Sequence, residues 1–354
     1  MVNFLSPSNK SKNSSSCSFS ELPDEIIMII LRNLDLKSLC RVSKVNKRFN
    51  NLTQDHRLHT SLNLEPYYLI INTQALNYLA PRCKYLRRLN LSYCNGIFSD
   101  DIGKFLVSHG SLLTHLQLNH LEIYDNTILE ISRICKNLKE LGLFYCYGIN
   151  DDGFSYLENL KFLEYLNVNE THITTETLCK ILRRNTRMRH LYIGGEDENL
   201  NPDKIVMELR NSCPDLESIK LRYNRNVHAR LNILTSKGIN DLAGCKNLRE
   251  MYLDWCNCSG ASFFRVFSSC QHLERVSLYY CEGLTERDIR ALALCKNLKK
   301  LDLTGILRCV TSEICHTIFM NCHKLEMINL RYSNIAKCLI LQWQQKYTHI
   351  TITA

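Results

Sequence analysis

The sequence CQHLERVSLYYCEGLTERDIRALALCKNLKKLDL, residues 270–303, decides the fold because it contains one complete motif and the start of the next. Cys270 opens a segment that leads into the apolar-x-apolar triplet VSL at 276–278. Cys295 opens the same order again and leads to LDL at 301–303. Residues two apart on a strand point to the same side, so each triplet predicts a short strand with one buried face.

The same motif recurs along the chain from residue 83 onward. Seven copies open with a cysteine: Cys83, Cys135, Cys213, Cys245, Cys270, Cys295 and Cys322. The first apolar position of the strand is occupied ten times, by Leu89, Leu116, Leu141, Leu166, Leu191, Ile219, Met251, Val276, Leu301 and Ile328. The second position is occupied by Leu91, Leu118, Leu143, Val168, Ile193, Leu221, Leu253, Leu278, Leu303 and Leu330. Neighbouring copies are 25 to 32 residues apart, which predicts one strand and one returning helix per copy, stacked as a solenoid.

Each expected strand leads into a helical segment. A second cysteine follows the strand in four copies, at Cys94, Cys146, Cys256 and Cys281. Thr or Asp then precedes a helical pattern, as in 151–154 and 285–289, and both residue types are suitable N-caps. Leu62–Leu64 and Ile350–Ile352 are expected to form the terminal strands. The predicted fold is an α/β solenoid, a horseshoe with parallel strands on its concave face and helices on its convex face.

The N-terminal part has a different character. Residues 1–18 are rich in Ser, Asn and Lys, so we expect a disordered tail. Residues 19–58 contain LPDEIIMIILRNLDLKSLCRVSKVNKRFNNL (22–52), whose apolar spacing predicts three short helices. A module of this size has more apolar residues than its own core can cover, so part of the stripe should bind another protein. The alternative is that the stripe packs on the repeat domain, 59–354.

These two patterns resemble a known family. The Leu-Pro opening of 22–52 and its closing aromatic residue, Phe49, are similar to an F-box, although many F-boxes carry Trp at this position. The order C-x2-L-x2-L-x-L-x2-C resembles the cysteine-containing leucine-rich repeat of F-box/LRR-repeat proteins. Together the resemblance covers residues 20–354.

The resemblance implies a function. F-boxes bind the adaptor Skp1, which links them to a cullin and its RING partner. The chain would then be the substrate-recognition subunit of a Skp1–cullin–F-box ubiquitin ligase, itself non-catalytic and without a cofactor, that presents a protein for ubiquitination and proteasomal degradation. The residues that correspond to the Skp1-binding set are Leu22, Pro23, Ile30, Leu34, Leu39, Val42 and Val45. The alternatives are a non-degradative repeat scaffold whose F-box-like segment only caps the solenoid, and a hydrolase or transferase that uses one of the cysteines.

Residues that alternate with the strand leucines are expected to face the concave side. Tyr, Trp and Arg dominate binding energy at protein interfaces, and three consecutive copies place such residues together. We therefore expect the substrate to bind Arg222, Tyr223, Tyr252, Asp254, Trp255, Arg275, Tyr279 and Tyr280, beside the insertion at 224–236. The alternative is that these rings only cover the edge of the sheet.

Composition excludes several other classes. The formal net charge of +9 comes from basic residues spread among acids, unlike the basic face of a nucleic-acid-binding protein. The longest apolar run, Ile26–Leu31, is far shorter than the roughly 20 residues of a membrane span. The 18 cysteines recur at packing positions, so we expect reduced, inert thiols and no metal, even at Cys256, Cys258 and His272. We expect a cytoplasmic or nuclear protein, and the lack of a targeting extension puts a mitochondrial association in doubt.

Overall fold

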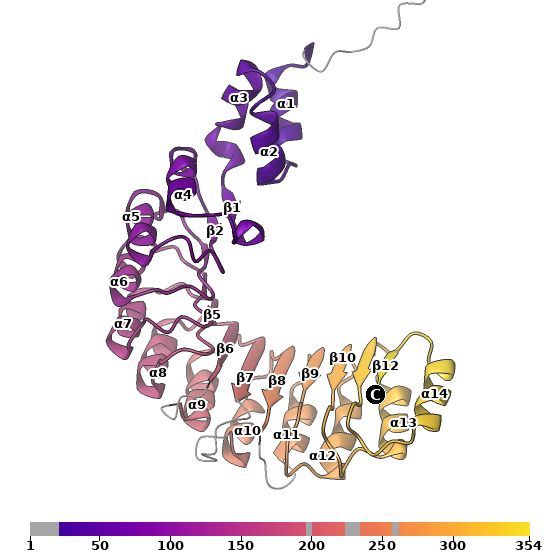
Figure 1. Cartoon of the computed structure of the whole chain (residues 1–354). Coiled ribbons are helices and arrows are strands. Elements are labelled where there is room, and N and C mark those ends of the chain that lie inside the picture. The colour runs from indigo at the N-terminus through magenta and orange to yellow at the C-terminus, as the bar shows by residue number, and fades with distance from the viewer. Residues whose placement is uncertain (1–20, 196–199, 224–233, 257–261) are drawn as a thin grey trace, which may run out of the picture. The chain divides into compact units, whose positions relative to one another are not determined.

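The chain divides into two compact units between Leu58 and His59. The computed structural model describes residues 21–195, 200–223, 234–256 and 262–354 (Figure 1). The expected tail 1–18, the position of Cys258 and most of the insertion after Tyr223 lie outside the described residues.

The first unit contains three short helices around a small core. These are α1 (Asp24–Leu31), α2 (Leu36–Val42) and α3 (Lys47–Thr53), followed by the 3-10 turn η2 (His56–Leu58). The side chain of Asp35 caps α2 by accepting from the Ser38 amide at 2.7 Å. Asn46 caps α3 in the same way, by accepting from the Phe49 amide at 2.9 Å. The buried core consists of Ile27, Met28, Leu31, Leu39 and Phe49.

The second unit is built on one sheet of twelve parallel strands that follow each other in chain order. The strands are β1 (Ser61–Asn63), β2 (Arg88–Asn90), β3 (His115–Gln117), β4 (Glu140–Gly142), β5 (Tyr165–Asn167), β6 (His190–Gly195), β7 (Ser218–Tyr223), β8 (Glu250–Asp254), β9 (Arg275–Ser277), β10 (Lys300–Asp302), β11 (Met327–Asn329) and β12 (Thr351–Thr353). The first apolar slots of neighbouring strands stand side by side, as in the pairs of Leu301 with Val276 and with Ile328. The α/β leucine-rich-repeat solenoid predicted from the slots is confirmed.

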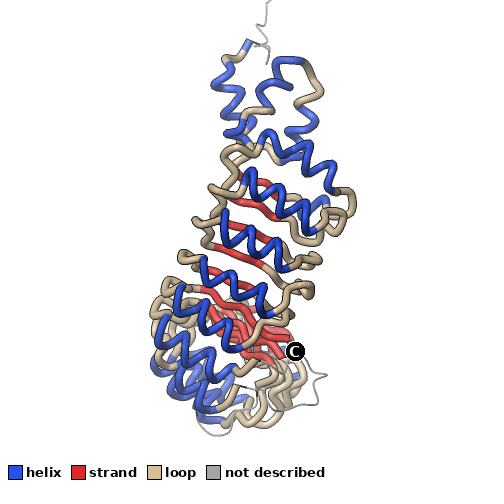
Figure 2. The backbone as a smooth tube through the Cα atoms, turned by 90° about the vertical axis from the view of Figure 1, so that its left-hand side faces the viewer, coloured by secondary structure: helices blue, strands red, loops and turns tan. Residues whose placement is uncertain are grey.

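A helix or a helical turn follows almost every strand and covers one face of the sheet, as Figure 2 shows. The α-helices are α4 (Thr73–Leu79), α5 (Ser99–His109), α6 (Asp125–Ile134), α7 (Asp151–Ser155), α8 (Thr175–Arg184), α9 (Pro202–Ser212), α10 (Ser236–Leu242), α11 (Ser262–Ser269), α12 (Glu286–Ala291), α13 (Ser312–Asn321) and α14 (Lys337–Lys346). The 3-10 turns are η3 (Glu65–Tyr67), η4 (Ala80–Arg82), η5 (Tyr156–Asn159) and η6 (Leu292–Leu294). The strand slots and the inward sides of these helices form one continuous core.

The helix starts correct one of the sequence expectations. Thr285 is an N-cap, as expected, and forms a capping box with Asp288. The cap of α7 is Asn150, whereas Asp151 is already the first helical residue. Asp151 instead accepts from the Thr174 amide and the Thr177 hydroxyl of the next repeat, at 2.9 and 2.8 Å. The Asp151 carboxylate therefore joins two repeats rather than capping its own helix.

The recurring cysteines are packing residues that also donate weak hydrogen bonds. Of the 16 cysteines in the described ranges, 14 are buried, Cys40 is half-buried and Cys338 is exposed, and all 16 are free thiols. The thiols of Cys146 and Cys281 point at carbonyl oxygens of the preceding repeat, Leu118 at 3.2 Å and Leu253 at 2.7 Å. These two buried thiols thus have a partner that replaces water.

Candidate protein-interaction surfaces

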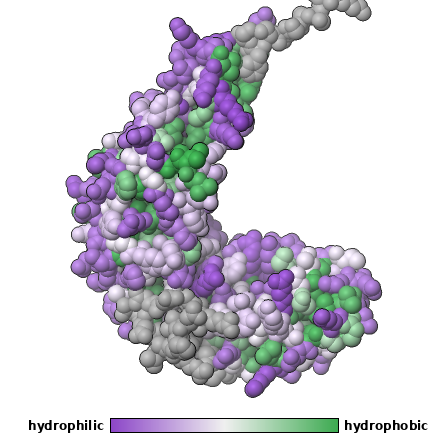
Figure 3. Space-filling model, in the orientation of Figure 1, coloured by the Kyte–Doolittle hydropathy of each residue, from purple (hydrophilic) through white to green (hydrophobic). Residues whose placement is uncertain are grey.

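Helix α1 of the first unit is apolar on all sides. Six of its eight residues are large and apolar. Ile27, Met28 and Leu31 form the buried side, whereas Ile26 and Ile29 are 43% and 55% exposed. Figure 3 shows apolar side chains reaching the surface of this unit among hydrophilic ones. A helix that is apolar all round is normally covered on both sides, so the outer side of α1 is suited to a partner.

The predicted Skp1-binding residues fall into three groups in this unit. Leu39 is buried in the module's own core, so its side chain holds the module together. Leu22, Leu34 and Val42 are partly buried and pack against that core. The remaining residues are more accessible: Ile30 is half-buried, Pro23 is exposed and Val45 is 65% exposed.

The set taken from the sequence omitted Ile26 and Ile29, the two exposed isoleucines of α1. The unbroken apolar run IIMIIL at 26–31 exceeds what one buried helix side needs, so it indicates that some of its members are exposed but not which ones. We call Ile26, Ile29, Ile30 and Val45, together with the partly buried Leu22, Leu34 and Val42, the F-box apolar surface.

Arg48 of α3 fixes the start of α1. Its guanidinium donates to the backbone carbonyl of Leu22 at 2.6 Å and to the Asp24 carboxylate at 2.8 Å. A planar guanidinium that reaches two acceptors constrains both. The Leu22-Pro23 segment is therefore held against α3 rather than free to move.

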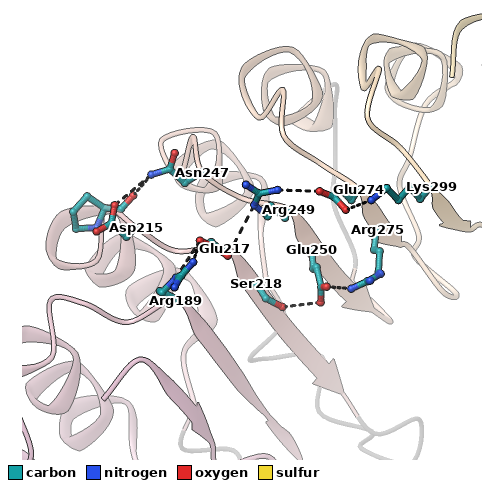
Figure 4. Close-up of polar contacts among 11 residues, drawn as sticks. Arg189, Asp215, Glu217, Ser218, Asn247, Arg249, Glu250, Glu274, Arg275 and Lys299 are labelled. Atoms are coloured by element: carbon teal, nitrogen blue, oxygen red, sulfur yellow. Dashed lines mark hydrogen bonds and ion pairs between the residues drawn. The ribbon is translucent and has the colours of Figure 1, made fainter. Parts of the chain in front are cut away.

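In the repeat unit, a row of charged residues of alternating sign lies at the N-terminal ends of successive strands. The position two residues before the first apolar slot is occupied in successive repeats by Lys139, Glu164, Arg189, Glu217, Arg249, Glu274, Lys299 and Glu326. We call this series the charge ladder, and Figure 4 shows its central part.

Ion pairs of the charge ladder join neighbouring repeats. Arg249 contacts Glu274 at 2.9 Å and Glu217 at 3.9 Å, and Lys299 contacts Glu274 at 2.7 Å. Arg189 pairs with Glu217 on the other side. These hydrogen bonds, from Lys299 first and then from Arg249, lower the pKa of Glu274 below its ordinary value. The cations of the ladder are thus satisfied within the molecule.

A second recurring position lies at the end of each strand and has a left-handed backbone. Seven residues share it, with φ between 51° and 66°: Tyr93, His120, Tyr145, Glu170, Trp255, Tyr280 and Tyr332. This conformation costs a residue with a Cβ atom about 1 kcal/mol. The amide of such a residue donates to a carbonyl of the next repeat, as Trp255 does to Tyr279 at 2.8 Å. Six of the seven carry a ring, so the turn aims a row of rings along the sheet.

In the C-terminal repeats these rings form a cluster. The rings of Trp255 and Tyr280 stack with centroids 4.4 Å apart and an interplanar angle of 10°. Tyr279 meets both at its edge, at 5.8 Å from Trp255 and 4.7 Å from Tyr280. The next repeat has Gly305 at the left-handed position, with φ of 77°, and a Cβ there would lie 2.6 Å from the Tyr280 ring. The glycine leaves room for Tyr280 to approach Tyr332, whose ring is 6.2 Å away.

Most of the predicted substrate-binding residues lie on three neighbouring strands, β7, β8 and β9. Arg222 and Tyr252 lie on β7 and β8, and Asp254 is directly paired with Arg222 in the sheet register. Asp254 accepts from the Ser277 hydroxyl at 2.9 Å, while burial raises the pKa of its carboxyl. Arg275 of β9 forms an ion pair with Glu250. Tyr223 ends β7, but its side chain and residues 224–233 of the insertion lie outside the described part.

A second row of rings lies on the N-terminal repeats, and its central ring, His120, was not identified from the sequence. His120 stacks between Tyr93 and Tyr145, with centroids 4.4 and 4.6 Å away, and burial lowers its pKa. Its signal was its position, two residues after the second apolar slot, where the other repeats carry Tyr or Trp. The concave residues beside this row include the amides Asn90, Gln117 and Asn119.

The thiols of the repeats are unsuited to nucleophilic chemistry. Burial raises the pKa of Cys135, Cys146, Cys213, Cys270 and Cys315 to about 12. A thiol in such surroundings is protonated at neutral pH and unreactive. Within the described ranges, no group of three His, Cys, Asp or Glu side chains could hold a metal ion, and no helix is long and apolar enough to cross a membrane.

Comparison with known proteins agrees with the two units. The F-box domain family matches residues 19–61. F-box/LRR-repeat protein 4 of Bos taurus is 30% identical over 283 residues, which are 78% of this chain and 44% of that protein. Putative F-box/LRR-repeat protein 23 of Arabidopsis thaliana is 30% identical over 159 residues, 42% of this chain and 32% of that protein. The chain thus spans less than half the length of these curated relatives.

A solved structure shows the same fold at low sequence identity. A chain from the crystal structure of the yeast Rad7 and Elc1 complex is similar with a TM-score of 0.55 and 18% identity, over 93% of this chain and 92% of that one. An F-box followed by a leucine-rich-repeat solenoid defines a class of modular interaction protein. Within that class, this chain carries an F-box domain and is similar to F-box/LRR-repeat proteins.

Proposed function

We propose that the chain is the substrate-recognition adaptor of a Skp1–cullin–F-box ubiquitin ligase. The F-box apolar surface binds Skp1, and through it a cullin and a RING subunit. The repeats bind a protein substrate for ubiquitination and proteasomal degradation. Such an assembly acts in the cytoplasm or the nucleus.

The observation that carries this proposal is the apolar outer side of α1. Ile26 and Ile29 are about half exposed. The module's own buried core has only five residues, so these two apolar side chains add nothing to it and remain available to a partner. Burying apolar area stabilises a complex by about 25 cal/mol per Å². An uncharged partner groove that covers these isoleucines is therefore the most favourable environment for this helix.

The chain would contribute position rather than a chemical group. Burial raises the pKa of Cys135 and of Cys146, so neither thiol is suited to carry ubiquitin as a thioester. A substrate held by the repeats is brought close to the ubiquitin-carrying subunits, and proximity alone accounts for a large part of such rate increases. We propose that the adaptor itself is not an enzyme.

The substrate is proposed to bind the concave face of β7–β9 and the ring cluster beside it. Arg222, Tyr252 and Arg275 lie on these three neighbouring strands, and Trp255 directly follows β8. Parallel strands are about 5 Å apart, so the side chains form one surface.

The test is co-purification followed by a ubiquitin-transfer assay. The full chain is purified from cells with its bound proteins, and the preparation is assayed for Skp1, for a cullin and for transfer of ubiquitin to a co-purified protein. We expect Skp1 and a cullin in equal amounts with the chain. If the repeats retain their bound proteins while Skp1 and the cullin are absent, the chain is a scaffold and the adaptor proposal is wrong.

A further inference from the structure

The concave face of the C-terminal repeats has a chemistry of its own. Resting on the proposed adaptor function, we propose that the substrate segment bound there is acidic and carries a large apolar side chain. The surface consists of Lys220, Arg222, Lys300 and Arg331 around the ring cluster of Trp255, Tyr279, Tyr280 and Tyr332. We call it the cationic face.

The first argument is that two sets of cations in the same repeats differ in their partners. Arg189, Arg249 and Lys299 of the charge ladder all form ion pairs with glutamates of neighbouring repeats. Among the described residues, the four cations of the cationic face form no ion pair. Lys220 instead lies over the ring of Tyr252, 5.9 Å from its centroid. The fold thus neutralises one set and leaves the other available for anions.

The carboxylates on the same face are already engaged by the protein. Asp302 accepts from the amide and the hydroxyl of Thr304, at 2.9 and 2.6 Å, and from Asn329 at 3.4 Å. Asp254 accepts from Ser277, and Glu250 pairs with Arg275. Four cations without an ion pair therefore stand beside three carboxylates that are half-buried and already hydrogen-bonded or paired. Opposite charge across an interface directs which partner binds.

The second argument is a depression that begins at the ring cluster. It has a volume of about 570 Å³ and lies between the segments that follow β9 and β10. Tyr280 and Gly305 form part of its wall, Leu307, which is 53% exposed, also lines it, and the oppositely charged Glu282 and Arg308 lie at the same depression. A space of this size beside an aromatic stack suits a Leu, Phe or Met side chain of the partner. The cations then bind the acidic residues on either side of it.

A protein segment fits this surface better than a single-stranded nucleic acid does. Nucleic-acid bases bind by stacking on free aromatic faces. Trp255 and Tyr280 stack on each other at 4.4 Å, so no base can enter between them. The concave surface of β2 and β3 differs, because the amides Asn90, Gln117 and Asn119 lie there and Arg88 contacts His115, which pairs with Glu140.

The test is selection from a phage library of random 12-residue peptides on the full chain, which needs no added Skp1. We expect enriched peptides with several Asp or Glu residues around one large apolar residue. The double variant Arg222→Glu/Arg331→Glu should weaken their binding at least about tenfold. The matched control is Lys180→Glu/Arg184→Glu, which makes the same change of charge on the exposed surface of α8 and should leave binding unchanged.

Further arms separate the sources of negative charge. One enriched peptide is resynthesised with its acidic residues replaced by phosphoserine or by serine. Binding of the acidic or phosphoserine form and loss with the serine form support the proposal and show which anion is preferred. Three results would each overturn the proposal. The first is enrichment of peptides without acidic residues, and the second is an equal effect of the two double variants. The third is displacement of the peptide by an oligouridylate of equal length that binds more tightly than the peptide.

The adaptor proposal fails separately from this one. Peptide selection measures the repeats alone and needs no ubiquitin transfer, whereas Skp1 and cullin co-purification measures the F-box. If acidic peptides bind a chain that never associates with Skp1, the adaptor function is wrong and the cationic face remains. If Skp1 binds and the selection shows no acidic preference, only the present inference is wrong.

Discussion

The F-box unit and the repeat unit solve the problem of binding in different ways. The F-box module has a core of five buried residues and exposes further isoleucines on the same helix that supplies its core. The repeat unit buries all of its strand slots and presents rings and charges on a framework fixed by ion pairs. The first surface is apolar and uncharged, whereas the second is charged and aromatic. A mutation in one unit should therefore change the binding of that unit's partner and leave the binding of the other unit's partner unchanged.

The largest expected effect is on the F-box apolar surface. Ile29→Asp places a charge where an apolar partner would bury it, and such a desolvated charge costs several kcal/mol. We expect Skp1 binding to fall by more than about a hundredfold while the repeat domain and its bound proteins are unaffected. Binding is measured by calorimetry and folding by circular dichroism.

Its control introduces the same charge elsewhere in the module. Asn51→Asp changes an exposed position of α3 and should leave Skp1 binding intact. Leu39 is unsuitable for this experiment because it is buried in the module's core. Equal Skp1 affinity of the wild type and Ile29→Asp would remove the outer side of α1 from the interface.

Thiol reactivity should distinguish exposed cysteines from those buried in the repeats. Cys338 is exposed, whereas burial raises the pKa of Cys135 to about 12. At neutral pH the thiolate fraction of Cys135 is then about a thousandfold lower than that of an ordinary thiol. We expect iodoacetamide to label Cys338 within minutes and the buried repeat cysteines only after unfolding, as read by peptide mass mapping. Rapid labelling of Cys135 in the folded protein would show that the repeats open readily.

The ring cluster should matter more for substrate binding than the N-terminal row of rings. Trp255→Ala removes the stacked ring beside the cationic face, and anchors of this kind contribute about 2 kcal/mol or more. We expect affinity for an identified substrate to fall about thirtyfold, with Skp1 binding unchanged. Tyr93→Ala is the matched control, since Tyr93 has the same left-handed conformation and also stacks on a neighbour. Equal losses with both variants would indicate that the rings serve the fold rather than the substrate.

The smallest expected effect concerns the charge ladder. Glu274→Gln should lower the free energy of unfolding by about 0.5 kcal/mol at pH 7, the scale of exposed ion pairs. Because the pKa of Glu274 is lowered below 4.5 in the folded state, this stabilisation is complete above the ordinary pKa of glutamate. It is lost as the pH falls through the lower folded value.

The measurement is the difference in urea unfolding between wild type and Glu274→Gln at several pH values. The difference should shrink as the pH falls below about 4.5. A difference that stays constant down to the most acidic condition would show that the ladder contributes no electrostatic stability.

The sequence predicts the fold well because each slot leucine has one possible place. Leu301 and Leu303 must face inward from a strand of period two, and both are buried. The rings could be located on the repeat, but their stacking could not be predicted, since it depends on the left-handed φ of Tyr280 and on the space left by Gly305. The exposure of Ile29 was equally hidden, because an apolar run does not reveal which of its members the core can accommodate.

The charge ladder also restricts how this chain can change in length during evolution. Its signs alternate from repeat to repeat, so an ancestor that lost the single repeat carrying Glu217 would place Arg189 beside Arg249. Loss of two adjacent repeats would instead bring Arg189 next to Glu274 and keep every neighbour of opposite sign. The same holds for duplications. The charge ladder therefore favours the gain or loss of repeats in pairs, because only an even number keeps charges of opposite sign next to each other.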